Sequence, residues 1–472
     1  VSAMRLAQKG YRIALLEMGK RLQANDFPKT NWDIRKYLWA PRLRCFGLQK
    51  ITLLNKLMLL HGVGVGGGSL VYANTLMQPQ PEVFRHSDWP SGVNWEECLS
   101  PHYETGRKML GVTTTPQLFE GEKMLRRIGK RMKIEESFHP TEVGIFFGTP
   151  NQIVDDPYFH GKGPKRIGCN FCGGCMIGCR FGSKNTLDQN YLYFAEKWGA
   201  QIFPETEVTK IIPDRDHYNV QTSSSTRWFQ RKGPTFSAKR VIVAAGVLGT
   251  VKLLLKNRDL YQTLPKISDL LGERVRTNGE SLLGATTFQK EHHFSKGVAI
   301  GAAIHPDKKT KIESVRYPSG SGLMRLLAVP LTGEGSKWTR PLKMLWKMVK
   351  ELPSFIKLWC VRDWADRTVI LLVMQTTDHL IHLGLGRSIL SGFRKHLEGR
   401  ATKKPIPSYI PVAQDAAMHL AQEIKGTPQN VISEVLLGTP ATAHILGGCC
   451  IGNNPSEGVV DSNHEVFGYP RL

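Results

Sequence analysis

The glycine-rich segment at residues 61–74 constrains the fold more than any other part of the sequence. It reads HGVGVGGGSLVYAN and places five glycines within the seven residues 62–68. Because glycine lacks a Cβ, the backbone can approach a ligand closely, and its exposed N–H groups can bind a pyrophosphate or border a flavin ring. A flexible linker would carry polar residues in place of Val63 and Val65. The segment therefore predicts a loop that holds a cofactor.

The first seventeen residues have the pattern of a helix followed by a strand. Residues 1–10 predict a helix that ends at Gly10, and residues 11–16 (YRIALL) predict a strand with Glu17 at its carboxyl end. In a dinucleotide-binding βαβ unit, an acidic residue about 20 positions after the glycine fingerprint binds a ribose hydroxyl. Glu17 fits that role if the fingerprint precedes residue 1, so we expect a truncated chain. An ordinary helix and strand ending in a surface glutamate is the alternative.

A second strand, turn and helix are expected at residues 240–255. Residues 240–249 (RVIVAAGVLG) predict a buried parallel strand that runs into a small-residue turn, and residues 250–255 start a helix. Ala245 and Gly246 let the chain turn tightly beside a cofactor, although simple packing of a helix on a sheet would use the same string. Upstream, residues 187–198 predict an amphipathic helix, and a strand pair follows whose first member ends near Val208.

These segments predict an α/β fold, α+β overall, with a Rossmann-like dinucleotide-binding domain and a mostly antiparallel substrate domain. A chain of 472 residues exceeds the size of a single core. The first domain is expected to comprise residues 1–75, 186–285 and 440–472. The second would comprise residues 76–185, a cap with a basic amphipathic helix near 120–132, and residues 286–439, where strand-like runs alternate with turns.

Three motifs occur in one order over nearly the whole chain. They are GVGGGSLVYAN at 64–74, VIVAAGVLGTVKLL at 241–254 and ATAHILGGC at 441–449. In these motifs the sequence resembles the glucose/methanol/choline oxidoreductase family, most closely its cholesterol oxidase branch. The resemblance implies FAD bound by the α/β domain, a substrate domain over the flavin, and hydride transfer from the CH–OH group of an alcohol to flavin N5.

The same resemblance implies a set of cofactor-binding residues. Glu17 matches the ribose-binding acid, residues 66–69 the loop along the flavin, Val208 the residue near the adenine, and Asn278 with Gly279 the turn before the chain leaves the flavin domain. The full set is Glu17, Gly64, Gly66, Gly67, Gly68, Ser69, Asn74, Val208, Ala245, Gly246, Asn278 and Gly279.

Two residues are candidates for catalysis. His444 in AHILGGC matches the family's histidine beside the flavin, where an imidazole can accept or orient the proton of the alcohol hydroxyl near neutral pH. Glu313 in KIESVRYPSG is aligned with the branch's acidic residue by its Pro and Gly spacing, where a carboxylate could act as a base on the oxidised steroid. Outside the motifs, a lone histidine is more often structural and a glutamate before a Tyr-Pro turn is commonly a solvated surface group.

Four of the nine cysteines, Cys169, Cys172, Cys175 and Cys179, follow the spacing C-x2-C-x2-C-x3-C. This is the spacing of the bacterial ferredoxin run, and the intervening glycines would let the chain wrap around a cubane. The sequence therefore predicts an iron–sulfur cluster, with free or disulfide-paired thiols as the alternative. Zinc is less natural because the run has no second pair of ligands.

The formal charge of +23 and the segment at 341–359 bear on partners. The Lys and Arg residues are dispersed and no nucleic-acid-binding motif gathers them, so nucleic acid is not an expected partner. Residues 341–359 (PLKMLWKMVKELPSFIKLW) predict a basic, aromatic-rich amphipathic helix, split by Pro353, that would suit a membrane interface. A packed helix pair with a solvated basic face is the alternative. With no signal peptide and no apolar run of eighteen residues, a cytoplasmic or membrane-peripheral location is expected.

The leading hypothesis is an FAD-dependent oxidase or dehydrogenase acting on a sterol or similarly apolar alcohol. Steroid isomerase activity as a second reaction is left open. The electron acceptor would be oxygen for an oxidase and is left open for a dehydrogenase. A sugar or polar-alcohol dehydrogenase feeding electrons through iron, and a non-catalytic flavin and membrane-binding module, are the alternatives.

Overall fold

The largest element of the fold is a seven-stranded sheet in which every pair of neighbours is antiparallel. The computed structural model describes residues 1–472 except 56, 91, 337, 388–394 and 403–405. In spatial order the strands are β19 (Ala328–Pro330), β23 (Gly426–Val431), β16 (Ser281–Thr287), β20 (Thr368–Gln375), β18 (Thr310–Val315), β17 (Ile300–Asp307) and β7 (His139–Pro140). Five of these strands lie within residues 286–439, where a mostly antiparallel sheet was predicted, whereas β7 and most of β16 come from outside that range.

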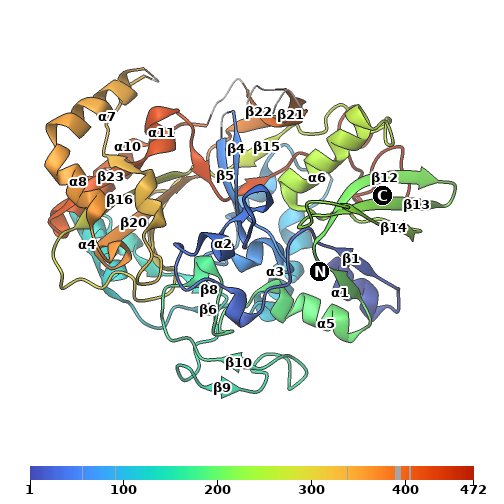
Figure 1. The fold of residues 1–472 in the computed structure, drawn as a ribbon, viewed down its shortest axis with the longest axis horizontal. Helices are drawn as coiled ribbons and strands as arrows, with labels where there is room; N and C mark the ends of the chain where they lie inside the picture. The colour runs from blue at the N-terminus through green and yellow to red at the C-terminus, as the bar shows by residue number, and fades with distance from the viewer. Residues whose placement is uncertain (56, 91, 337, 388–394, 403–405) are drawn as a thin grey trace.

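Two helices cover this sheet and complete its core. The first, α4 (Glu120–Arg131), lies within one residue of the predicted span, and the second is α10 (Pro411–Glu423). Leu125 and Ile128 of α4 and Leu420 of α10 are fully buried against Ile304 and Leu371 of the sheet. Figure 1 shows these helices with α7 (Thr339–Lys350), α8 (Leu352–Cys360) and α11 (Ile432–Leu436) at the left of the molecule.

A second core lies around two smaller sheets and α6 (Gly246–Leu255). The four-stranded sheet has the order β22 (His396–Ala401), β21 (Leu380–Gly386), β15 (Val275–Thr277) and β25 (Ile445–Leu446). The three-stranded sheet of β12 (Thr206–Asp214), β13 (His217–Ser224) and β14 (Lys232–Ala238) lies at the right of Figure 1. Strand β12 begins at Thr206 and continues well past Val208, where the sequence had placed its end.

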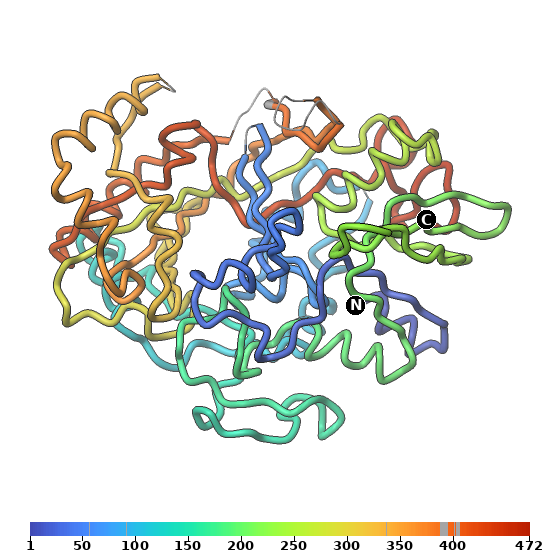
Figure 2. The backbone as a smooth tube through the Cα atoms, in the orientation of Figure 1, coloured from blue at the N-terminus to red at the C-terminus, as the bar shows by residue number. Residues whose placement is uncertain are grey.

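The hairpin of β4 (Gln49–Leu54) and β5 (Leu57–Gly62) contributes Leu54, Leu57 and Leu59 to the second core and is clear in the tube of Figure 2. Strand β5 also pairs in parallel with β24 (Ala441–Thr442). The glycine-rich loop starts where β5 ends, at Gly62. The hairpin thus carries this loop into the centre of the molecule.

The N-terminal segment forms the predicted helix and strand. Helix α1 (Ser2–Gln8) is followed by β1 (Ala14–Leu16), which pairs in parallel with β11 (Gln201–Phe203), and α1 packs on α5 (Tyr191–Lys197). Gly10 has φ +82°, a left-handed conformation that favours glycine at a helix end. The predicted helix at 187–198 is shorter than expected because its first turn, Leu187–Gln189, is a 3-10 turn.

The prediction of a buried parallel strand at 240–245 is wrong. This segment has no regular secondary structure and Ile242 is 58% exposed, although α6 begins after it as expected. A strand exists only where a neighbour receives its hydrogen bonds. Within the described residues no strand pairs with 240–245, and the Val241 N–H donates instead to the Arg471 carbonyl at 3.0 Å.

The remaining elements are shorter or lie on the periphery. They are α2 (Ile34–Tyr37), α3 (Trp95–Met109), α9 (Trp364–Arg367), β2 (Trp39–Ala40), β3 (Cys45–Phe46), β6 (Thr113–Thr114), β8 (Glu142–Val143), β9 (Ile153–Val154) and β10 (Arg166–Ile167). Of the helices in the described part of the chain, none combines the length and apolar character needed to cross a membrane.

Candidate active site

His444 lies at the junction of two sheets. It sits between β24, which pairs with β5, and β25, which pairs with β15 through Thr277 and Ile445. Asn278 directly follows β15, so the ladder brings it beside the histidine. The side-chain nitrogen of Asn278 lies 3.1 Å from Nδ1 of His444. The motif at 441–449 and the turn at Asn278 and Gly279 therefore meet at one point.

Glu280 is the buried partner of His444. Its carboxylate is bonded to Nδ1 of His444, and it accepts hydrogen bonds from Thr442 Oγ1 at 2.6 Å and from the Ala443 N–H at 3.2 Å. The Glu280 side chain is 2% exposed, whereas that of His444 is 55% exposed. An ionised carboxylate only accepts hydrogen bonds, so Nδ1 carries the proton and Nε2 is left free to accept one. The sequence reasoning named Asn278 and Gly279 and missed Glu280, the acid that follows them.

The protonation of His444 reflects these neighbours. Burial alone would lower the pKa of the imidazole, but the hydrogen bond to Glu280 and the negative charges of Glu280 and Glu313 outweigh burial and raise the pKa above its ordinary value. A histidine of this kind can take up a proton from a hydroxyl near neutral pH.

Glu313, the second catalytic candidate, lies on β18 in the middle of the seven-stranded sheet. Its side chain is 2% exposed and forms an ion pair with Lys311 Nζ at 2.8 Å. It is therefore a buried carboxylate and not a solvated surface group. Because its charge contributes to the raised pKa of His444, the two candidates act on each other electrostatically. Its role as a base stays a prediction.

Glu17 and the glycine-rich loop are in direct contact. Oε1 of Glu17 accepts hydrogen bonds from the Gly19 N–H at 2.7 Å and from the Gly64 N–H at 3.2 Å. Burial raises the pKa of Glu17, although both backbone bonds oppose that shift. A Cβ on residue 19 would lie 2.4 Å from the backbone nitrogen of Gly64, so the two segments can lie this close only because residue 19 is a glycine.

The loop itself presents bare backbone. Gly64, Gly66 and Gly67 have φ values of +138°, +114° and +57°, and a Cβ on Gly67 or Gly68 would meet no atom within 4 Å. These two residues therefore border open space. Ser69 fixes the loop from the other side, because its Oγ donates to the Gly66 carbonyl at 2.6 Å and accepts from the Leu187 N–H at 2.9 Å.

Asn74 and Lys184 lie under this loop. Asn74 is fully buried with φ +73°. Lys184, which is 2% exposed, donates from Nζ to the carbonyls of Leu70 at 3.0 Å and Cys175 at 2.8 Å, and burial lowers its pKa to about 8. This lysine ties the glycine loop to the cysteine segment. Nothing in the motifs pointed to it.

The other predicted cofactor residues are Val208, Ala245, Gly246 and Gly279. Val208 is half-buried at an irregularity of β12, where the register with β13 shifts. Ala245 caps α6, and Gly246, with φ +66°, is the first residue of that helix. Gly279 follows Asn278 with φ +52°. Their roles at the cofactor stay predictions.

The prediction of a metal site at Cys169, Cys172, Cys175 and Cys179 is not supported by the geometry. All four are free thiols, and among the described residues no group of three or more His, Cys, Asp or Glu side chains is arranged to hold a metal ion. Burial, followed by the charges of neighbouring cysteines, raises the pKa of Cys172 to about 11.

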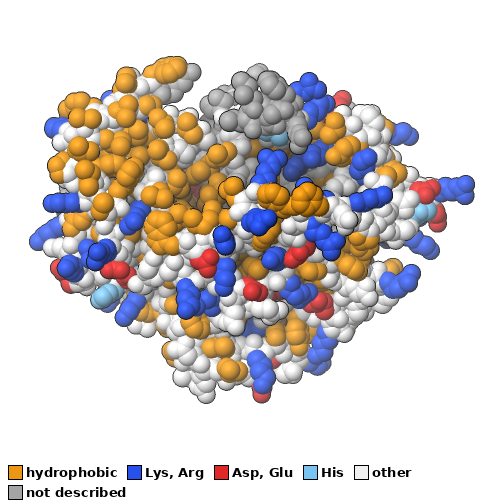
Figure 3. Space-filling view, in the orientation of Figure 1, with side chains coloured by type: hydrophobic (Ala, Val, Ile, Leu, Met, Phe, Trp, Pro, Cys, Tyr) orange, Lys and Arg blue, Asp and Glu red, His pale blue; other side chains and the backbone are white. Residues whose placement is uncertain are grey.

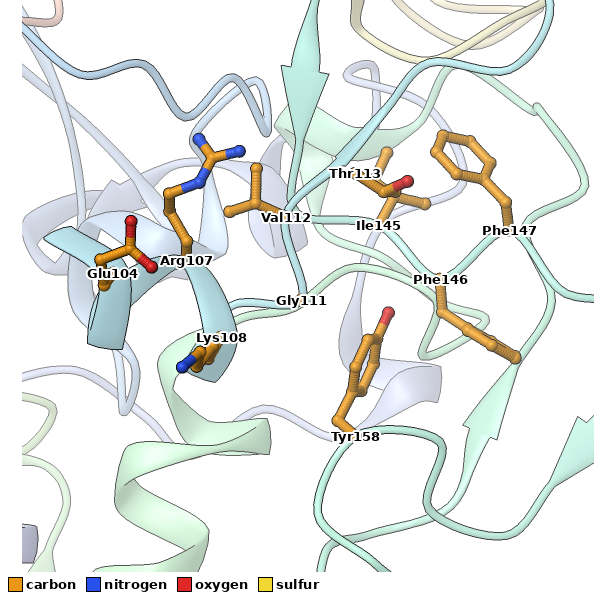
Figure 4. Close-up of a pocket in the computed structure, with 10 residues that line it drawn as sticks. All are labelled: Glu104, Arg107, Lys108, Gly111, Val112, Thr113, Ile145, Phe146, Phe147 and Tyr158. Atoms are coloured by element: carbon orange, nitrogen blue, oxygen red, sulfur yellow. The ribbon is translucent and has the colours of Figure 1, made fainter.

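A separate pocket of about 510 Å³ lies at the end of α3. Figure 4 shows the charged side chains of α3, including Arg107, on one side of the pocket and the aromatic rings of Phe146, Phe147 and Tyr158 on the other. The lining includes none of the predicted site residues. Arg107 forms a bidentate pair with Glu142, with nitrogen-to-oxygen distances of 2.6 and 2.7 Å, so its charge is already matched.

Comparison with known proteins agrees with the motifs. The family model of the GMC oxidoreductases matches residues 164–257. A cholesterol oxidase of Acinetobacter baumannii is 40% identical over the whole chain and 86% of its own length. The chain belongs to the GMC oxidoreductase family. A cholesterol oxidase of Mycobacterium tuberculosis is 42% identical over the whole chain and 83% of its own length, and a long-chain-alcohol oxidase of Arabidopsis thaliana is 22% identical over 99% of the chain and 60% of its own length. The predicted resemblance is confirmed, and the chain is an FAD-dependent oxidoreductase acting on alcohols.

Proposed function

We propose that this GMC oxidoreductase is a sterol oxidase that removes a hydride from the carbinol carbon of cholesterol or a similar 3-hydroxysterol and passes the electrons to oxygen. The observation that carries the proposal is the hydrogen bond from His444 to the buried carboxylate of Glu280, with Asn278 beside it. The cholesterol oxidases at 40% and 42% identity favour a sterol over a sugar as substrate.

The residues present fit FAD. The bare backbone of Gly67 and Gly68 borders open space, and the loop is pinned by Ser69 and by the contact of Gly64 with Glu17. In the proposal Glu17 holds the ribose, residues 66–69 follow the flavin, Val208 lies near the adenine, and the flavin-binding part comprises residues 1–75, 186–285 and 440–472. Strand β21 lies outside these ranges, but its Ile381 and Leu383 belong to the same core as α6, so we add this strand to the flavin-binding part.

The protein residues supply the proton transfer. With Nδ1–H donated to Glu280, Nε2 of His444 accepts the proton of the substrate hydroxyl, and the buried carboxylate stabilises the imidazolium that forms. The FAD that the glycine loop would hold would supply the acceptor for the hydride that leaves the carbinol carbon. Because the base must be neutral, activity rises with pH as His444 loses its proton.

Glu313 is proposed as the base of a second step, the isomerisation of the oxidised steroid. Its carboxylate is buried and influences His444, which supports a place near the reacting rings. Moving a double bond needs one proton removed from one carbon and returned to another, which a single carboxylate can do. A Glu313→Gln enzyme would then oxidise the sterol and release the unisomerised ketone.

The proposal is tested by an anaerobic absorbance spectrum before and after addition of cholesterol. We expect the flavin to bleach in the wild-type protein and in the control His102→Ala, an exposed histidine on α3, and to stay oxidised in His444→Ala at equal FAD content. Bleaching in His444→Ala would refute the assigned base, and no bleaching in any form would refute the sterol.

Iron and labile sulfide are assayed in the same samples. Stoichiometric iron and sulfide would replace the oxidase with a dehydrogenase carrying an iron–sulfur cluster at the four cysteines of residues 169–179. Their absence, with consumption of oxygen during turnover, supports oxygen as the acceptor.

A further inference from the structure

Helices α7 and α8 are apolar on two faces, and only one of them packs on the protein. On the inner face Met344 packs with Val329 and Val435, and Phe355 and Leu358 are also buried. An amphipathic helix of a globular protein normally turns its other face to water with polar side chains. These two helices do not follow that pattern.

The opposite face of the pair carries large apolar side chains in the open. Apart from the neighbours Leu345 and Trp346, they are separated by three or four residues. The exposed fractions are 66% for Leu342, 52% for Leu345, 61% for Trp346, 76% for Val349, 49% for Leu352, 53% for Ile356 and 42% for Trp359. We call these seven residues the outer apolar face. The space-filling view in Figure 3 shows hydrophobic side chains gathered over α7 and α8 at the upper left. Apolar surface of this extent on a soluble protein usually marks a binding site.

Lysines accompany the outer apolar face. Lys343, Lys347, Lys350 and Lys357 lie on the same two helices, against one acidic residue, Glu351. The ammonium of Lys350 lies 4.7 Å from the ring centre of Trp346. A protein partner that buried this face would have to remove water from the lysines, whereas anionic lipid headgroups would pair with them at the depth where Trp side chains prefer to lie.

We propose that the outer apolar face docks into the surface of an anionic lipid bilayer. Helix α7 has 12 residues and α8 has 9, so they are about 18 and 14 Å long and lie along the interface instead of crossing a core of about 30 Å. The apolar side chains enter the boundary between headgroups and acyl chains, and the exposed Lys350 and Lys357 contact the phosphates, whereas Lys343 and Lys347 already donate to backbone carbonyls at 2.7 Å.

The docked face is connected to the proposed active site. Arg340, in the first turn of α7, donates from Nη1 to the Glu434 carbonyl at 3.0 Å. The carboxylate of Glu434 accepts hydrogen bonds from Ser281 Oγ at 2.7 Å and the Leu282 N–H at 2.9 Å, in the residues directly after Glu280. Helix α11, which packs against α7, ends at Leu436, and both Leu436 and Leu437 are exposed, at 44% and 64%. Apolar surface therefore continues from the helix pair into the segment that leads to His444.

This part of the inference rests on the sterol oxidase function, but the docking itself does not, so the two are tested separately. Docking is measured by sedimentation with vesicles of phosphatidylcholine alone and of phosphatidylcholine with phosphatidylserine, without turnover. The variant Trp346→Gln/Val349→Gln removes two residues of the outer apolar face. The matched control Leu43→Gln/Phe229→Gln removes two side chains that are 75% and 84% exposed elsewhere.

We expect the wild type and the control to bind phosphatidylserine vesicles equally, and the Trp346→Gln/Val349→Gln variant to bind at least ~10-fold more weakly. Binding should weaken in high salt, because the lysine contacts are screened. On cholesterol dispersed in detergent the variant should match the wild-type rate, while on cholesterol in vesicles it should be slower.

Equal vesicle binding by the variant and the wild type would overturn the docking. The docking would also be overturned if the wild type were a dimer, the variant a monomer, and both bound vesicles equally. A second copy of the chain would then cover the outer apolar face. A wild type that binds vesicles but oxidises no sterol would instead overturn the proposed function and leave the docking intact.

Discussion

Replacing Glu280 by glutamine tests the arrangement of the active site most directly. The carboxylate is 2% exposed and accepts from Thr442 Oγ1 and the Ala443 N–H as well as from His444. A glutamine has the same shape, and with its nitrogen in the place of Oε1 its oxygen keeps the bond to the Ala443 N–H, while the Thr442 hydroxyl accepts a hydrogen bond instead of donating one. Its amide then turns towards Nδ1 of His444 as a donor, so the imidazole proton moves to Nε2. The nitrogen that should accept the hydroxyl proton is then already protonated.

The expected loss follows from the bond removed. A hydrogen bond to a charged group contributes about 1.5–3 kcal/mol, and about 1.4 kcal/mol changes a rate tenfold, so kcat should fall by about 10- to 100-fold. Without the negative charge of Glu280 the pKa of His444 falls, so the acidic limb of the pH–rate profile should move to lower pH. The assay is flavin reduction by cholesterol in a stopped-flow instrument between pH 5 and 9, with FAD content measured in each sample.

Glu273→Gln is the matched control, because Glu273 also pairs with a histidine, Nδ1 of His382 at 2.8 Å, but is 41% exposed. Exposed ion pairs contribute little, so this variant should keep the wild-type rate and profile. A Glu280→Gln enzyme that reduces flavin within twofold of the wild type, with its acidic limb unmoved, would refute the role assigned to Glu280.

Three further changes have calculable outcomes. Burial raises the pKa of Glu434 to about 7, so the wild type should lose up to about 3 kcal/mol of stability as the pH rises from 4.5 through 7. A glutamine carries no charge at any pH. In chemical denaturation Glu434→Gln should therefore unfold at a higher denaturant concentration than the wild type above pH 7, but not at pH 4.5. Glu122→Gln leaves the buried guanidinium of Arg316 without its partner and should cost about 3–5 kcal/mol in chemical denaturation, and a cost below 1 kcal/mol would contradict the pairing. Gly62→Ala puts a Cβ 2.6 Å from the Gly67 carbonyl oxygen and should lower the free energy of unfolding by about 1–3 kcal/mol. A Cβ at Gly68 meets no protein atom within 4 Å, so Gly68→Ala should keep the melting temperature of the cofactor-free protein. The same Cβ would occupy the space proposed for FAD, so this variant should lose FAD on gel filtration.

Local patterns in the sequence predicted local structure well. The helix ending at Gly10, helix α4 and the break between α7 and α8 near Pro353 all follow from side-chain periodicity and from residues that stop a helix. The run at 240–245 shows the limit of such patterns. Its composition favours a strand, but a strand depends on a neighbour elsewhere in the chain, and composition carries no information about that neighbour.

The site was predictable to a different degree, because family motifs identify residues and not their partners. His444 and Asn278 were both named from separate motifs, and the structure brings their side chains within 3.1 Å. Glu280 was missed although it adjoins Asn278 and Gly279, because a glutamate after a turn is ordinarily exposed. Only its burial against Thr442 and His444 distinguishes it.

The topology explains why motifs so far apart in the sequence converge. Strand β5 ends at the glycine loop and pairs with β24, which leads into His444, while β25 leaves His444 and pairs with β15, which leads into Asn278 and Glu280. Strand β16 then begins at Ser281 in the seven-stranded sheet, where Glu434 fixes its first residues. Because His444 connects two sheets and Glu280 leads into a third, a shift of any one sheet would change the distance between the imidazole and its carboxylate. The hydrogen bond between them is therefore as much a product of the strand pairing as of the two residues that form it.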